Sequence, residues 1–217
     1  GTNGKSSIAD FYYQILDLNN KKVASIGTLG IKTRKYKKNL SNTTIDPIQL
    51  SKILDKLKKQ NINNVIMEAS SHGLSQNRLD GLLFNTGIFT NLSQDHLDYH
   101  KNIKNYFKAK LYLFEKLIKK RGNIITDEKI PEFKKIKNIA TNKKLNLFSL
   151  LDKKNNFQFL SHQYEGESQL VEIKYKNSIH KIKLNLIGKI QLKNVQMAIA
   201  AAIKLSLIHI SEPTRRS

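Results

Sequence analysis

Apolar residues recur along this chain with helical spacing in some stretches and as short runs in others. Five apolar side chains directly after the opening GTNGKSS segment follow the i, i+3, i+4, i+7, i+8 spacing of an amphipathic helix. They are Ile8, Phe11, Tyr12, Ile15 and Leu16. Further helices are expected near residues 47–59, 103–119 and 191–204, and the last is alanine-rich and apolar enough to pack against a core. The opening segment therefore lies at a helix N-terminus.

Short apolar runs between these helices predict buried strands. Four runs precede residue 148, at residues 23–27, 65–67, 88–89 and 124–125. Because they alternate with helices, we expect the α/β class, with a mostly parallel sheet flanked by helices. Beyond residue 148 the pattern changes to shorter strands with polar turns between them, at residues 157–160, 170–175 and 179–186. These strands predict a small β-rich extension on the same domain.

The composition is that of a globular protein. With 217 residues, 39% of them hydrophobic and 25% charged, the chain can bury a sizeable core, which excludes wholesale disorder. No apolar run approaches membrane-spanning length, so we expect no membrane insertion. No basic-then-apolar signal segment stands at the start, and the absence of cysteine excludes a disulfide framework. A cytoplasmic location is therefore expected.

The formal net charge of +21 raises the alternative of a nucleic-acid-binding protein, because clustered cations release counterions from phosphate backbones. Only five of the 38 basic residues are arginine, the residue suited to bidentate recognition of bases and phosphates. The lysines are also spread along the whole chain. We expect a solvated, lysine-rich surface and no nucleic-acid partner.

The GTNGKSS segment predicts a phosphate-binding loop. Its glycines let the backbone approach phosphate oxygens, Lys5 supplies a compact positive charge, and Ser6 can ligate magnesium. The alternative is a glycine turn capped by serine. The full GxxxxGK[ST] pattern would start two residues before Gly1, and such a loop normally follows a strand, so we expect the chain to be N-terminally truncated.

Two further side chains are expected near this loop. Glu68 follows the run at residues 65–67, and His96 lies in the NLSQDHLDYH segment that follows the run at residues 88–89. Ligands of open parallel sheets bind at the carboxyl ends of the strands, so both should converge on a nucleotide. Glutamate offers the hard oxygen that magnesium prefers. The alternatives are a solvated strand cap and a structural histidine.

Lys110 is a charge on an apolar helix face. It lies seven residues after Ile103 and four before Phe114, both on the face that should meet the core. The alternative is snorkelling, in which the aliphatic stem lies along the core and the ammonium reaches water.

Several strings in register resemble the Mur ligases. They are GTNGKSS, NTT at residues 42–44, MEASSHGLSQNR at 67–78, FTNLSQDHLDYH at 89–100 and YFKAKLYLF at 106–114. Within that family, SSHGL-x-Q-x-R and DHLDYH resemble the branch that extends UDP-N-acetylmuramoyl-L-alanyl-D-glutamate by a third amino acid. The resemblance implies the P-loop central domain of such a ligase.

The resemblance also implies a set of site residues. The ATP-binding set would be Gly1, Thr2, Asn3, Gly4, Lys5, Ser6, Ser7 and Asn194. Magnesium would be bound by Ser6, Glu68, His96 and Lys110 as its carbamate, formed with carbon dioxide. The UDP-muramoyl substrate would be held by Asn42, Thr43, Thr44, Ser70, Gln76 and Arg78. The catalytic group would be Lys5, Glu68, His96 and Lys110.

The implied reaction joins the UDP-muramoyl dipeptide to a diamino acid through an acyl phosphate formed from ATP. The sequence departs from the family at residues 188–194, where Gln191 replaces a usual asparagine, and after NTT, where the chain continues IDP instead of proline at once. The nearest alternative is folylpolyglutamate synthetase, which shares the chemistry but extends a folate; SSHGLSQNR argues against it.

The expected organisation is one central ATP-binding domain over residues 1–204, without the uridine-binding and C-terminal domains of the family. The segment at residues 205–215, LSLIHISEPTR, resembles a translated sequencing adapter, so residues 205–217 are expected to be non-native. We expect a monomer that is inactive as an isolated fragment.

Overall fold

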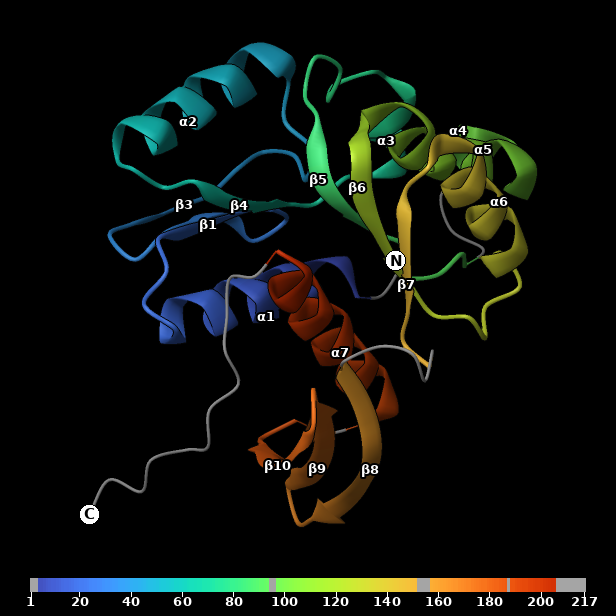
Figure 1. Cartoon of the computed structure of the whole chain (residues 1–217). Helices are drawn as coiled ribbons and strands as arrows, with labels where there is room; N and C mark the ends of the chain where they lie inside the picture. Colours follow the sequence, from blue (N-terminus) through green and yellow to red (C-terminus); the bar gives the residue numbers. More distant parts are fainter. Residues whose placement is uncertain (1–3, 94–96, 152–156, 187, 206–217) are drawn as a thin grey trace.

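The computed structural model describes residues 4–93, 97–151, 157–186 and 188–205, which form three sheets with helices packed around them (Figure 1). The first sheet has the order β3 (Lys37–Lys38), β2 (Gly30–Lys32), β1 (Val23–Gly27) and β4 (Asn64–Met67). The second has the order β5 (Phe84–Ile88), β6 (Ile118–Thr126) and β7 (Asn146–Ser149). The third has the order β10 (Ser178–Leu184), β9 (Ser168–Tyr175) and β8 (Phe157–Glu165).

The pairing directions confirm the α/β class. β1 pairs with β4, β5 with β6 and β6 with β7, all in parallel. β2 and β3 add an antiparallel ribbon to the edge of β1. The third sheet is antiparallel throughout and is the expected β-rich extension.

The helices alternate with the parallel strands. They are α1 (Lys5–Leu18), α2 (Pro47–Lys59), α3 (Ser71–Ser75), α4 (Leu97–His100), α5 (Ile103–Tyr112), α6 (Phe133–Lys143) and α7 (Lys189–Lys204), with a π-helical turn η1 (Leu113–Leu117) after α5. Local sequence sets the start of α2, because the Asp46 side chain accepts a hydrogen bond from the Gln49 amide at 3.0 Å and Pro47 stands in the first turn. None of the described helices is long and apolar enough to cross a membrane.

Helices cover both faces of the first sheet. In Figure 1, α2 lies on one side of β1 and β4, whereas α1 and α7 lie on the other. This layering follows from the alternation of side chains along a strand. Val23 of β1 points to the core cluster under α1, whereas Ala24 and Ile26, on the opposite face of the same strand, point to the cluster under α2.

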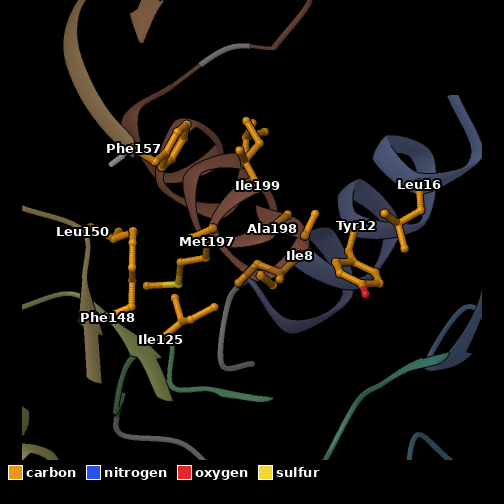
Figure 2. Close-up of a cluster of buried hydrophobic side chains, with 14 of the residues drawn as sticks. Ile8, Tyr12, Leu16, Ile125, Phe148, Leu150, Phe157, Met197, Ala198 and Ile199 are labelled. Carbon is orange, nitrogen blue, oxygen red and sulfur yellow. The ribbon is translucent and has the colours of Figure 1, made fainter. Parts of the chain in front are cut away.

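The largest core cluster joins α1 and α7 to strands of all three sheets (Figure 2). Ile8 and Tyr12 of α1 face the buried side of α7, where Met197 lies beside Ile125 and Phe148. Phe157, Val171 and Ile173 bring the third sheet into the same core. The β-rich extension therefore packs against the α/β part of the fold and shares its core.

The structure corrects several expected bounds. The helix expected at residues 103–119 ends as an α-helix at Tyr112, continues as η1 and gives way to β6 at Ile118. Ile103, expected on the buried face, is 40% exposed because it stands in the first turn of α5, beyond the packed part of that helix. The run at 88–89 covers the last residue of β5 and the residue after it, and the run at 124–125 lies near the end of β6; β2, β3, β7, α3, α4 and α6 were not expected.

Candidate functional site

The opening loop leads into α1 through a glycine in the left-handed region. Gly4 is the residue before the helix, with φ of 115°, and its carbonyl accepts the first helical hydrogen bond from Ile8 at 2.8 Å. A Cβ here would lie 2.7 Å from the Asn194 side-chain oxygen, so glycine is required by both conformation and space. Lys5, Ser6 and Ser7 form the first turn, whose backbone amides can receive an anion. Gly1, Thr2 and Asn3 lie outside the described residues.

Glu68 meets this helix start at the carboxyl end of β4. The Ser6 hydroxyl donates to its carboxylate at 2.8 Å, and the Thr28 amide and hydroxyl donate at 2.8 and 3.1 Å. The residue is 5% exposed, so this carboxylate is a buried anion held by three donors at the positive end of a helix. A Cβ at Gly27 would overlap it, which explains glycine at the end of β1.

The NTT and SSHGL segments form one hydrogen-bonded unit. The Thr44 hydroxyl accepts from the Ser70 amide at 2.9 Å and lies 3.0 Å from the Ser70 hydroxyl, which in turn accepts from the Gly73 amide at the start of α3. The Arg78 guanidinium donates to the Thr44 carbonyl at 2.7 Å. Thr43 lies 3.0 Å from Thr28, hydroxyl to hydroxyl. Asn42 is exposed beside this unit.

Gln76 belongs to a second polar group on α3 and α4. Its side-chain amide donates to the Tyr99 hydroxyl at 3.1 Å, and the Ser75 hydroxyl donates to the same oxygen at 3.2 Å. These two hydrogen bonds, that of Ser75 first, lower the pKa of Tyr99 below its usual value. The His72 ring lies 4.1 Å from the Tyr99 ring and 5.5 Å from the His100 ring, centroid to centroid.

Lys110 lies among aromatic rings on the inner face of α5. Its ammonium donates to the Asn91 carbonyl at 2.6 Å and stands 4.9 Å from the Tyr106 ring centroid and 5.4 Å from that of Phe89. Tyr106 also stacks against His100 at 5.2 Å. The Lys110 ammonium is therefore bound by a backbone carbonyl and by the faces of two aromatic rings.

Asn194 reaches the opening loop from α7. It is 5% exposed, and its side-chain amide donates to Gln191 at 3.3 Å, the residue that departs from the family pattern. Lys193 pairs with Asp127 at 2.6 Å, and Asp127 is 2% exposed at the end of β6. This ion pair anchors the start of α7 so that Asn194 faces Gly4.

The expected site residues gather to different degrees. Lys5, Glu68 and Thr90 line one cavity of about 340 Å³ between β4 and β5. Lys110 lies next to it, because its ammonium donates a hydrogen bond to the carbonyl of Asn91, the residue after Thr90. His96 lies outside the described residues, so its expected approach to Glu68 is not described. Among the residues that the structure does describe, no three His, Cys, Asp or Glu side chains cluster as a metal site.

Sequence reasoning missed Thr28, Tyr99 and His72. Thr28 follows β1 directly, so the rule that placed Glu68 at a strand end also applies to it. His72 lies in the SSHGL segment and Tyr99 in the DHLDYH segment, but only the tertiary packing of α3 against α4 and α5 shows that they touch.

Comparisons with known proteins agree on one family. The profile described as the Mur ligase middle domain matches residues 1–202. A UDP-N-acetylmuramoyl-L-alanyl-D-glutamate–2,6-diaminopimelate ligase of Zymomonas mobilis subsp. mobilis is 36% identical over 198 residues, which cover 91% of this chain and 41% of that protein. The chain spans less than half the length of the curated relatives it matches.

Solved structures give the same picture. A structure of a ligase with that same name superposes with a TM-score of 0.82 at 25% identity, covering 99% of this chain and 46% of the other. A folylpolyglutamate synthetase from Lactobacillus casei superposes with a TM-score of 0.66 at 13% identity, covering 96% and 57%. The second likeness shows a shared fold alone.

Proposed function

The chain belongs to the Mur ligase family, and we propose that residues 1–204 are the central ATP-binding domain of a longer ligase that adds the third amino acid to UDP-N-acetylmuramoyl-L-alanyl-D-glutamate. The observation that carries this proposal is the 2.8 Å hydrogen bond between Ser6 and Glu68, which joins a phosphate-loop helix to the carboxyl end of a parallel strand. Ligands of such sheets bind at that edge. We assign no function to residues 205–217.

The donor set at this edge fits Mg²⁺ and ATP. Ser6 and Glu68 supply adjacent hard oxygens, and Glu68 is a buried carboxylate whose charge a cation would neutralise. We assign magnesium binding to Ser6, Glu68, His96 and carbamylated Lys110. When bound, magnesium neutralises charge on the phosphate oxygens.

The residues of the opening loop position the phosphates. Lys5 and the amides of residues 1–7 orient the terminal phosphate of ATP for in-line attack by the substrate carboxylate, which forms an acyl phosphate and releases ADP. The amino group of the incoming amino acid then attacks the acyl carbon, loses a proton and expels inorganic phosphate. Asn194, beside Gly4, is assigned to the nucleotide. No covalent bond to the protein is required.

The UDP-muramoyl substrate is assigned to the unit built from NTT and SSHGL. Arg78 suits its anionic groups, and Asn42, Thr43 and Gln76 are at least partly exposed. Thr44 and Ser70 bond to each other and to backbone, so they hold the shape of this unit. The names of the relatives specify 2,6-diaminopimelate, which makes it the first diamino acid to assay.

Carbamylation is proposed for Lys110. The neutral amine would add to carbon dioxide, lose a proton and become an anionic oxygen ligand in place of a cation on an apolar helix face. The support is its position: Lys110 bonds to Asn91, just past the end of β5, at the same edge that carries Glu68 past the end of β4.

The test is substrate-dependent phosphate release by the full-length ligase. Release from ATP is expected only when the UDP-muramoyl dipeptide and a diamino acid are both present. A folate with glutamate is the matched control, because folylpolyglutamate synthetase shares the fold. Folate-dependent turnover, or release that ignores the muramoyl substrate, would overturn the proposal.

A further inference from the structure

Two adjacent threonines of the NTT segment connect to Glu68 by separate routes. The Thr44 hydroxyl donates to the Glu68 backbone carbonyl at 3.1 Å. The Thr43 hydroxyl lies 3.0 Å from that of Thr28, and the Thr28 hydroxyl donates to the Glu68 carboxylate at 3.1 Å. The segment assigned to the UDP-muramoyl substrate therefore reaches the residue assigned to magnesium through its backbone and, by a chain of two hydroxyls, through its side chain.

The direction of donation along the chain of hydroxyls is fixed by the carboxylate. An ionised carboxylate only accepts hydrogen bonds, so the single hydroxyl proton of Thr28 is used on Glu68. The contact between Thr28 and Thr43 then forms with Thr43 as the donor. The Thr43 side chain is half-buried and its oxygen has a further lone pair, so it can accept a hydrogen bond from an N–H or O–H group of a bound ligand.

The backbone of Thr28 is held by a tight turn. Thr28 follows β1 directly, and Gly27 before it pairs with Gly30 at the start of β2, so the turn contains only two residues. The Thr28 amide donates to one carboxylate oxygen of Glu68 at 2.8 Å, and its hydroxyl donates to the other. A single residue of a short hairpin therefore orients both oxygens of the carboxylate.

Ser6 and Thr28 both donate to Glu68, but their other partners differ. Ser6 is itself assigned to magnesium, whereas Thr28 is bonded on its far side to Thr43. A residue that orients a carboxylate ligand acts on metal affinity through that ligand, and loss of such a partner typically weakens metal binding by about 10–100-fold. Thr28 is therefore placed to act on the metal from the substrate side.

We propose that Thr28 is a positioning residue that couples the two ligands: a substrate group bonded to Thr43 makes Glu68 a better ligand for magnesium, and bound magnesium in turn strengthens substrate binding. The inference rests on the proposed function. A group that donates to Thr43 strengthens the next hydrogen bonds of the chain and restricts the rotation of both hydroxyls. Part of the entropy of fixing Glu68 is then already lost when the metal binds. Because such coupling is reciprocal, it can be measured from either ligand.

Calorimetric titration of the UDP-muramoyl dipeptide into the full-length ligase, without nucleotide, tests this inference. The Kd of the dipeptide is measured with and without saturating Mg²⁺. In the natural protein Mg²⁺ is expected to lower this Kd by at least about fivefold, and in Thr28→Val by less than about twofold. Thr28→Ser returns a hydroxyl to the turn and is expected to restore the effect. Valine keeps the branched shape of threonine, and Thr28 is exposed, so the comparison isolates the hydroxyl.

Thr33→Val is the matched control. It removes a threonine hydroxyl after β2 of the same sheet, where that hydroxyl bonds to the backbone of Tyr36, and it should leave the response to Mg²⁺ as in the natural protein. The inference is overturned by a natural protein whose Kd ignores Mg²⁺, by a full response in Thr28→Val, or by an equal loss in Thr33→Val. A dipeptide that fails to bind with or without Mg²⁺ would instead refute the proposed function, on which the inference rests.

Discussion

Ser6 and Glu68 are 62 positions apart in the chain, yet the Ser6 hydroxyl donates to the Glu68 carboxylate at 2.8 Å. The bond forms because α1 starts, and β4 ends, at the same edge of the fold. Thr28, at the end of β1, completes the carboxylate's surroundings with two further hydrogen bonds. Three separate chain segments thus converge on one buried anion.

Replacing Glu68 with glutamine should impair the use of magnesium without unfolding the protein. The amide keeps one oxygen acceptor for the Ser6 and Thr28 hydroxyls but loses the acceptor of the Thr28 amide and the charge, so Mg²⁺-dependent phosphate release by the full-length ligase should fall by roughly 100-fold or more. Asp10→Asn is the matched control, because Asp10 is a carboxylate on α1, the helix that carries Ser6, and it pairs with Lys32 instead. An unchanged magnesium dependence in Glu68→Gln would contradict the assignment.

Lys110→Ala should abolish ligase activity, and added bicarbonate or short carboxylic acids should partly restore it by replacing the missing anion. The modification itself is measured by ¹³C NMR of protein equilibrated with ¹³C-labelled carbon dioxide, where a carbamate signal should appear and should vanish in the variant. Lys108→Ala, an exposed lysine on the same helix, is the control. Wild-type rates in Lys110→Ala would rule out the carbamate.

Ser75→Ala should raise the pKa of Tyr99 back toward its ordinary value. The Ser75 hydroxyl stabilises the phenolate by donating to it, so loss of that donor favours the protonated phenol. Titration of ¹³C-labelled tyrosine by NMR measures the change. Tyr112, whose pKa is raised by its hydrogen bond to Asp80, is the internal control and should titrate as before.

Met197→Ala should lower the free energy of unfolding by about 2–5 kcal/mol, because Met197 is 1% exposed in the core shared by α7, β6 and β7. Urea denaturation measures this. Ile190→Ala, on the same helix but at a side chain that is 63% exposed, should change stability by less than about 0.5 kcal/mol. Equal effects of the two substitutions would show that α7 does not pack as described.

Much of the fold could be predicted because its signals are local. The spacing from Ile8 to Leu16 gave α1, and short apolar runs gave parts of β1, β4, β5 and β6. α6 was missed because its 11 residues carry six lysine and asparagine side chains within a weak apolar pattern, and it is held by Ile136 and Ile139 against the core. β3 has two exposed lysines and exists only through pairing with β2.

The sequence could identify candidate residues of the site, but not the contacts between them. The position of Glu68 after a strand, and that of Lys110 on an apolar helix face, could be read from the sequence, and their roles in a site stay predictions. No local pattern shows that Thr28 donates twice to Glu68 or that Tyr106 connects Lys110 with His100. Such contacts depend on how distant segments pack.

The most direct test of the central claim is anomalous diffraction from crystals of the full-length ligase grown with Mn²⁺ and a non-hydrolysable ATP analogue. Mn²⁺ replaces Mg²⁺ at oxygen sites and scatters anomalously. The account predicts a peak within about 2.5 Å of oxygens of both Ser6 and Glu68, next to the terminal phosphate. A nucleotide bound elsewhere, or a metal peak distant from both side chains, would contradict it.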